Sequence, residues 1–332
     1  MSAQTLPTAF RNNCLDFAKG IACILVLFLH SRFPGTLGDV IQSLSRYCMP
    51  FFFMVSGYFA YSTREQGREQ WRLSKIRHIG LITLWSSLFY LLIAILADSL
   101  PLTSLKGWAK FLLLNEPHIF AGQMWYLYAL LYVYLIWALI DRRNWYRFAY
   151  IAAIVLFVCY LLLAQGAYFA GFSINPAVYR NFLFLGFPHF MLGNWLRRNR
   201  EKLHISNRLL LTVAIVTTLL CPVERFLVGR VFGVQLVSYP QGISIFLLSI
   251  QNPSFGADSK LTVLGRRYSM YIYILQFFVI RVFRWIYARL SLENHIPAQY
   301  LQPLLVLAGT LALSVLVLFV KEHILTKQVK PS

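Results

Sequence analysis

Lys19 and His30 are the residues of the first apolar segment whose side chains could do chemistry. They are eleven positions apart, a step that returns to nearly the same side of a helix, about 16 Å further along its axis. An imidazole there suits a general base that removes a proton from a hydroxyl, and an ammonium suits the stabilisation of negative charge. Two plainer interpretations stay open: Lys19 pairs with Asp16 at the membrane surface, and His30 ends the helix at headgroup level.

The composition indicates the setting of these residues. Of 332 residues, 58% are hydrophobic and 13% are charged, which is more apolar surface than one soluble core requires. The net charge of +19 would favour nucleic acid in a soluble protein, but here the cations lie in short segments between apolar runs. We therefore expect a polytopic membrane protein that contacts membrane lipids and binds no nucleic acid.

Apolar windows of membrane-spanning length predict an all-α membrane protein, a bundle of about ten transmembrane helices. The windows lie near residues 14–32, 45–62, 78–99, 123–141, 147–166, 180–196, 208–223, 235–251, 269–289 and 301–320. Pro50 and the segment 186–188 predict kinks in two of them. Lys and Arg gather in alternate loops, so the positive-inside rule places both termini in the cytoplasm. No repeat or linker divides the chain, and we expect one domain over residues 1–332.

The cysteines predict neither a metal site nor a disulfide framework. They are five in number, scattered along the chain, and none forms a Cys-x-x-Cys pair. One bridge between Cys48 and Cys221 stays open.

Several short motifs occur in an order that resembles one known family. Residues 16–20 read Asp-x-x-Lys-Gly, with His30 following Lys19 at the spacing given above, and residues 50–58 read Pro-x-Phe-Phe-x-x-Ser-Gly-Tyr. Further matches are the segments 75–77, 124–130, 187–193 and 264–273. Over nearly its whole length the chain resembles the acyltransferase-3 family of integral-membrane acyltransferases.

The resemblance implies ten transmembrane helices and transfer of an acyl group, often acetyl, from acyl-CoA bound at the cytoplasmic side to a glycan hydroxyl. It makes His30 the motif histidine, Lys19 its basic partner, and Arg77 the cytoplasmic arginine of the third span. Two residues depart from the pattern. Lys19 stands where arginine is common, which keeps the charge but loses the bidentate fork. Gln276 stands where the family often has histidine, so no second histidine acts there.

Coenzyme A carries several phosphate charges, which require cations at the inner surface. Arg72, Lys75 and Arg77 form one cationic cluster, of which Arg77 is nearest the membrane, and the segment 197–200 forms another. These are the expected donor-binding residues, although most such clusters only set the topology.

Four residues are expected to contact the acceptor. Arg46 lies at the outer mouth, Ser56 lies in the second span, and Trp125 and Tyr128 could form a stacking wall for a sugar. Packing roles stay open for these residues. Ser56-Gly57 also suits close helix packing, and aromatic residues such as Trp125 and Tyr128 commonly pack within bundles.

The resemblance leads us to expect a multi-pass O-acetyltransferase of the cell's cytoplasmic (inner) membrane that modifies a cell-surface glycan or its lipid-linked precursor. Acetyl-CoA is the expected acyl donor, and no metal is expected. His30 is the catalytic general base and Lys19 the catalytic cation, while an acyl-His intermediate stays open. The alternative from another class is a glycan or small-molecule transporter or flippase that transfers no acyl group.

Overall fold

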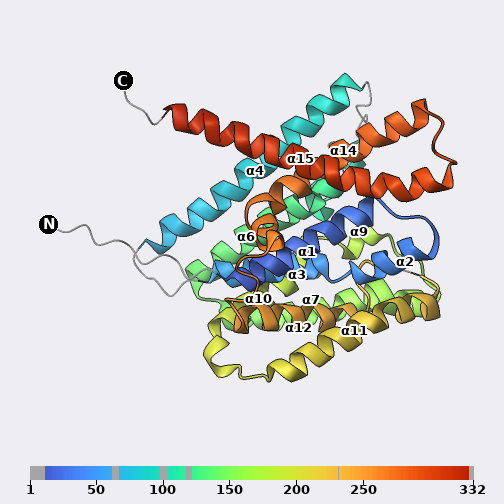
Figure 1. Ribbon diagram of the computed structural model, residues 1–332. Coiled ribbons are helices and arrows are strands. Elements are labelled where there is room, and N and C mark those ends of the chain that lie inside the picture. Colours follow the sequence, from blue (N-terminus) through green and yellow to red (C-terminus); the bar gives the residue numbers. More distant parts are fainter. Residues whose placement is uncertain (1–11, 62–66, 98–103, 117–121, 231, 329–332) are drawn as a thin grey trace. The chain divides into compact units, whose positions relative to one another are not determined.

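The computed structural model describes residues 12–61, 67–97, 104–116, 122–230 and 232–328 (Figure 1). Every regular element within these residues is a helix. Those that are long and apolar enough to cross a membrane are Asn13–His30, Arg68–Leu96, Gly122–Arg143, Tyr146–Phe169, Asn207–Val228, Lys260–Arg289 and Ile296–Ile324. The described part of the chain is therefore an all-α membrane protein, as the composition predicts.

The expected number of ten spans is not confirmed. The windows 45–62, 180–196 and 235–251 hold shorter helices, namely α3 (Cys48–Ala60), α10 (Phe187–Arg198) and α12 (Ser238–Gln251). Pro50 lies in the first turn of α3, where proline is tolerated because no intrahelical amide is lost. The segment before α10 is the π-helical turn η3 (Phe182–Gly186), so the helix changes geometry where a kink was expected. The orientation of the termini stays a prediction.

The chain forms two compact units, which we describe separately. Unit 1 contains the chain up to Cys48, Ile205–Val231 and the chain from Gln235 on, and unit 2 contains Met49–His204 with Phe232–Val234. The single domain expected over residues 1–332 stays a prediction.

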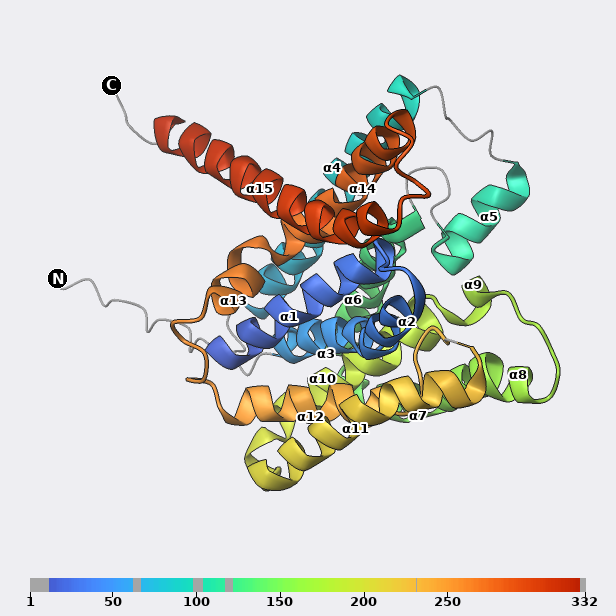
Figure 2. The ribbon, with the colours of Figure 1, turned by 45° about the vertical axis from the view of Figure 1, so that its right-hand side comes forward.

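Unit 1 is built around its first helix. Its elements are α1 (Asn13–His30), α2 (Gly35–Leu44), α11 (Asn207–Val228), α12, α13 (Lys260–Val263), the π-helical η5 (Leu264–Tyr268), α14 (Ser269–Arg289) and α15 (Ile296–Gln328). α1 packs against α12, α13, η5 and α14, while α11 pairs with α12 and α14 pairs with α15 (Figure 1, Figure 2).

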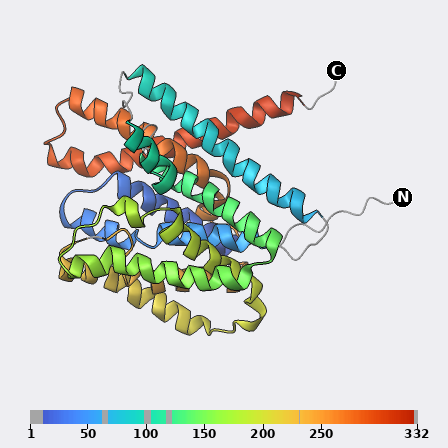
Figure 3. The same ribbon diagram turned by 180° about the vertical axis from the view of Figure 1, so that it is seen from behind.

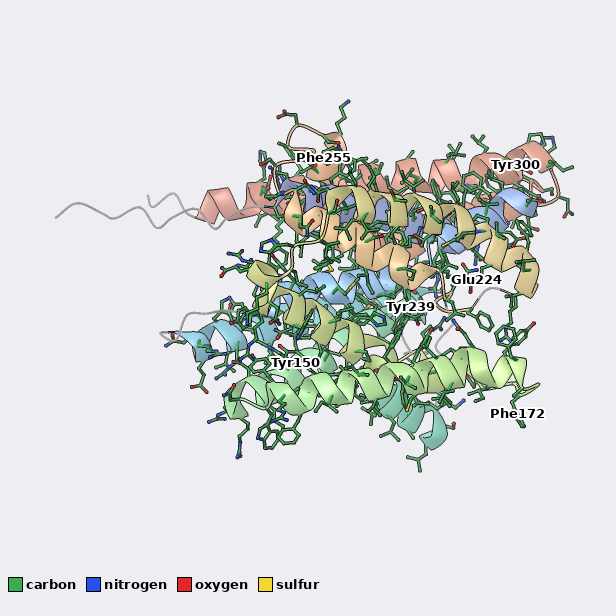
Figure 4. All side chains as sticks on the ribbon, turned by 90° about the horizontal axis from the view of Figure 1, so that it is seen from below. Tyr150, Phe172, Glu224, Tyr239, Phe255 and Tyr300 are labelled. Carbon is green, nitrogen blue, oxygen red and sulfur yellow. The ribbon has the colours of Figure 1, made fainter. Side chains whose placement is uncertain are left out.

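One carboxylate fixes the start of α12. Both oxygens of Glu224, labelled in Figure 4, accept hydrogen bonds from the backbone amides of Leu236 and Val237 at 2.9 Å. These amides lie at the entry to the helix, where amides lack intrahelical partners and a negative charge is favourable.

All five cysteines are free thiols, so the bridge left open between Cys48 and Cys221 is not formed.

The described residues of unit 2 form both long and short helices. Its elements are α3, α4 (Arg68–Leu96), α5 (Leu105–Leu114), η1 (Gly122–Met124), α6 (Trp125–Arg143), α7 (Tyr146–Leu161), η2 (Leu162–Gly166), α8 (Ala167–Phe169), α9 (Pro176–Tyr179), η3, α10 and η4 (Arg200–Lys202). α4, cyan in Figure 3, packs against α6, and α7 packs against α10. Asn144 has a φ of 55° between α6 and α7, a left-handed conformation that ends a helix and that asparagine tolerates.

Candidate active site

α1 carries both predicted catalytic residues on one continuous helix. The Asn12 side chain caps its start by accepting a hydrogen bond from the Leu15 amide at 2.7 Å, and His30 is its last residue. Because the helix is unbroken, Lys19 and His30 share one side of it, about 16 Å apart along the axis. The His30 imidazole is half-buried, and its ring centre lies 4.5 Å from that of Phe277 on α14.

The Lys19 ammonium belongs to a compact charge cluster in unit 1. Lys19 Nζ donates to Asp16 Oδ1 at 2.9 Å, and Arg266 Nε donates to Asp16 Oδ2 at 3.0 Å. Arg266 also donates to the Asn13 side-chain oxygen at 2.5 Å. The pairing of Lys19 with Asp16, left open above, is therefore formed. Arg266 is a functional candidate that sequence reasoning did not assign a role, although it lies in the motif segment 264–273.

Two glycines hold this charge cluster together. A Cβ on Gly265 of η5 would lie 2.6 Å from the backbone nitrogen of Gly20 and closer still to the carbonyl oxygen of Asp16. A Cβ on Gly20 would lie 3.0 Å from the carbonyl carbon of Leu261. The backbones of α1 and the α13–η5 segment therefore touch, which only glycine permits at both positions. This crossing carries Arg266 to Asp16.

A cavity of about 770 Å³ in unit 1 lies beside a different side of α1. It is lined by residues of α1, α11 and α12 and by Phe255, which is labelled in Figure 4. The α1 residues that line it include Ala18, Ile21 and Leu25, which lie roughly 100° to 180° around the helix from Lys19 and His30. This cavity is mostly apolar and does not bring the two predicted catalytic residues together.

Arg72, Lys75 and Arg77 lie in unit 2, on the first turns of α4. Arg72 donates to Asp141 Oδ2 at 2.6 Å, and Arg68 donates to Asp141 Oδ1 at 2.5 Å. The Lys75 ammonium lies 5.6 Å from the ring centre of Trp71, and Arg77 is exposed. The cluster is therefore not uniform, because, within the described residues, Arg72 alone of the three is ion-paired with a buried carboxylate, which it shares with Arg68. Sequence reasoning missed Asp141, which adjoins two arginines that were read only as topology signals.

A second glycine crossing lies in unit 2 and joins α3 to α10. A Cβ on Gly57 would lie 2.6 Å from the carbonyl carbon of Phe190, and one on Gly193 would lie 2.7 Å from that of Met54. The packing interpretation of Ser56-Gly57 thus applies to Gly57. Ser56 itself donates its hydroxyl to the carbonyl of Phe52 at 2.9 Å, within its own helix.

The aromatic residues expected to contact a sugar lie on α6. The Tyr128 and Ser87 hydroxyls are hydrogen-bonded at 2.6 Å, and the Tyr128 ring centre is 4.8 Å from that of Phe111. The Arg180 guanidinium lies 5.6 Å from the Trp125 ring centre. The structure thus places Trp125 and Tyr128 one turn apart on the same helix. Of the other two acceptor candidates, Ser56 belongs to unit 2 and Arg46 belongs to unit 1.

Among the described residues, no group of three or more His, Cys, Asp or Glu side chains could hold a metal ion.

Comparison with known families identifies the class of protein. The chain belongs to the acyltransferase-3 family, whose acyltransferase domain matches residues 12–322. Comparisons with curated proteins and with solved structures gave no match. Together with the membrane-spanning helices, the family makes this protein a membrane acyltransferase.

Proposed function

We propose that the protein transfers an acyl group, acetyl in the simplest case, from acyl-coenzyme A to a glycan hydroxyl. The donor binds at the cytoplasmic side of the cell membrane, and the acceptor is a cell-surface glycan or its lipid-linked precursor. The observation that carries the proposal is the placement of His30 and Lys19 on one side of α1 in a chain that matches the family over residues 12–322.

His30 acts as the general base in this reaction. It takes the proton of the acceptor hydroxyl while the hydroxyl oxygen attacks the carbonyl carbon of the thioester. The carbon–sulfur bond then breaks, the ester stays on the glycan, and the leaving thiolate of coenzyme A takes the proton from the imidazolium. In the two-step variant the acyl group first moves to an imidazole nitrogen and then to the acceptor.

Lys19 contacts the donor rather than the reacting carbonyl. A separation of about 16 Å along α1 is far beyond hydrogen-bond reach, so the two side chains cannot touch the same reacting atoms. The extended pantetheine arm of coenzyme A spans a length of this order. Lys19 is therefore assigned to a phosphate or amide of the donor, and the thioester lies near His30.

The remaining candidates divide between donor and acceptor. Lys75 and Arg77 attract the donor from the inner surface, whereas the ion pair of Arg72 with Asp141 makes Arg72 a structural residue first. Trp125 and Tyr128 on α6 offer aromatic faces to the acceptor sugar.

His30→Gln tests the proposal, because it removes the base while keeping a polar side chain of similar size. We expect normal membrane insertion and a rate of acyl transfer lowered by about 10²- to 10⁴-fold. The matched control is His204→Gln, which changes an exposed histidine outside the helices and should leave the rate unchanged.

The readouts are coenzyme A release from acetyl-CoA by purified protein and mass spectrometry of glycans from cells with and without the chain. Wild-type transfer by the His30 variant would remove the histidine from the mechanism. Glycan movement across the membrane without any consumption of thioester would favour the flippase alternative.

A further inference from the structure

Guanidinium groups outnumber carboxylates at one end of unit 2. α3, α6 and α10 end there, and α4 and α7 begin there. Asp141 is the buried carboxylate of this end, with its side chain only 2% exposed. Arg68 and Arg72 each occupy one of its oxygens, and Tyr146 also donates its hydroxyl to Oδ1. Asp141 thus accepts hydrogen bonds from three donors.

Arg197 and Arg198, the last residues of α10, keep their positive charge. Neither forms an ion pair with a carboxylate in the part of the chain that the structure describes. Arg197 donates to the Tyr58 hydroxyl at 3.0 Å, and its guanidinium lies 5.0 Å from the centre of that ring. The Arg198 guanidinium lies 5.1 Å from the ring centre of Tyr146. Tyrosine faces orient a guanidinium without neutralising it, and they leave N–H donors at its edge for another acceptor.

The tyrosines that orient these arginines are themselves fixed. Tyr146 is tied to Asp141, and Tyr58 follows Gly57 directly at the crossing of α3 with α10. On α10, the Asn194 amide donates to the carbonyl of Gly57 at 3.4 Å and accepts from the Tyr150 hydroxyl at 2.9 Å. Tyr150 is labelled in Figure 4 on α7. The end of α10 is therefore held in place before any ligand arrives, which lowers the entropy lost on binding.

We propose that Arg197 and Arg198 form the subsite that binds the phosphates of the coenzyme A donor. This inference rests on the proposed function and changes its cation assignment, because the structure gives Arg72 a carboxylate partner and gives Arg197 and Arg198 none among the described residues. Planar guanidinium forks match the tetrahedral oxygens of a phosphate group and bind it bidentately. Anionic lipid headgroups present the same phosphate chemistry, so the experiment must separate the two sources.

The test compares three forms of the full-length protein purified in neutral detergent: wild type, Arg197→Ala/Arg198→Ala, and Arg142→Ala/Arg147→Ala. The last is the matched control, because it removes the same charge from exposed positions at the same end of unit 2. The probes are free coenzyme A, pantetheine without phosphates, and nanodiscs that contain phosphatidylglycerol. We expect the Arg197/Arg198 variant to bind coenzyme A at least about 10-fold more weakly, and pantetheine with unchanged affinity. The control variant should bind both as the wild type does.

Equal affinity of the Arg197/Arg198 variant and the wild type for coenzyme A would overturn the subsite. Weaker binding only to the phosphatidylglycerol nanodiscs would also overturn it, and would assign the arginines to lipid. Thermal unfolding of each variant in detergent tests whether it is folded. The variant Arg197→Lys/Arg198→Lys should recover only part of the affinity for coenzyme A, because lysine lacks the bidentate guanidinium fork. If the wild type transfers acyl groups and the Arg197/Arg198 variant binds coenzyme A as tightly as the wild type, the subsite is refuted and the proposed function stands. Arginine-dependent binding of coenzyme A without transfer refutes the proposed function instead.

Discussion

The crossing of α1 with η5 makes a sharp prediction for Gly265→Ala. The new Cβ would lie 2.6 Å from the backbone nitrogen of Gly20, whereas an ordinary contact begins at 3.4 Å. The neighbouring atoms are backbone on both sides, so no side chain can turn away to make room. The two helices must therefore separate by about 1 Å, and overpacking of this kind costs about 1–3 kcal/mol of stability.

The same displacement should reach the chemistry. Arg266 follows Gly265 directly and holds Asp16, which in turn holds Lys19. A misplacement of about 1 Å in groups that position a substrate lowers rates by about 100-fold. We thus expect Gly265→Ala to lower both the unfolding temperature in detergent and the rate of acyl transfer in membranes.

Gly80→Ala is the matched control, with the opposite sign expected. Gly80 lies within α4, and a Cβ there would meet only the Leu131 Cδ1 atom, at 4.0 Å. Alanine should stabilise that helix by about 0.5–1 kcal/mol, because glycine loses more backbone entropy on folding. Gly265→Ala that unfolds and transfers like the wild type would refute the argument that a glycine contact positions the charge cluster.

Three further substitutions test the charge clusters. Asp141→Ala should cost about 3 kcal/mol of unfolding free energy in detergent, because it leaves the partly buried Arg72 guanidinium without its carboxylate; a loss below about 1 kcal/mol would contradict this. Asp39→Ala, which breaks more exposed pairs with Arg32 and Arg225, should cost at most about 1 kcal/mol of unfolding free energy in the same assay. A larger loss would contradict the expectation that exposed ion pairs contribute less than buried ones. Lys19→Met should raise the KM for acyl-CoA by about 10-fold with little change of kcat, and an unchanged KM would remove Lys19 from donor binding.

Periodicity in the sequence predicts what lies within one helix. The shared side of α1 for Lys19 and His30, and the proximity of Asp16 to Lys19, both follow from the helical repeat and are seen in the structure. Membrane-spanning length likewise predicts the long helices. It does not predict the short helix α2, which lies between two of the predicted windows, because ten residues are too few for a membrane span.

Contacts between distant segments lie outside that reasoning. Arg266 is 250 positions from Asp16, and Arg72 is 69 positions from Asp141, so neither pair has a local spacing signal. The glycines of the motifs were the available signal, since a glycine within a helix that must pack tightly marks a close approach of backbones. Sequence alone does not say which two glycines meet.

The cluster around Asp16 changes how the replacement of arginine by lysine at position 19 should be viewed. Asp16 offers two carboxylate oxygens, of which Lys19 takes one and Arg266 takes the other. The fork that Lys19 lacks is thus present in Arg266, which bonds Asp16 through Nε and Asn13 through Nη2. The ammonium keeps two of its three N–H donors for a ligand, and the cluster of two cations and one carboxylate carries a net charge of about +1.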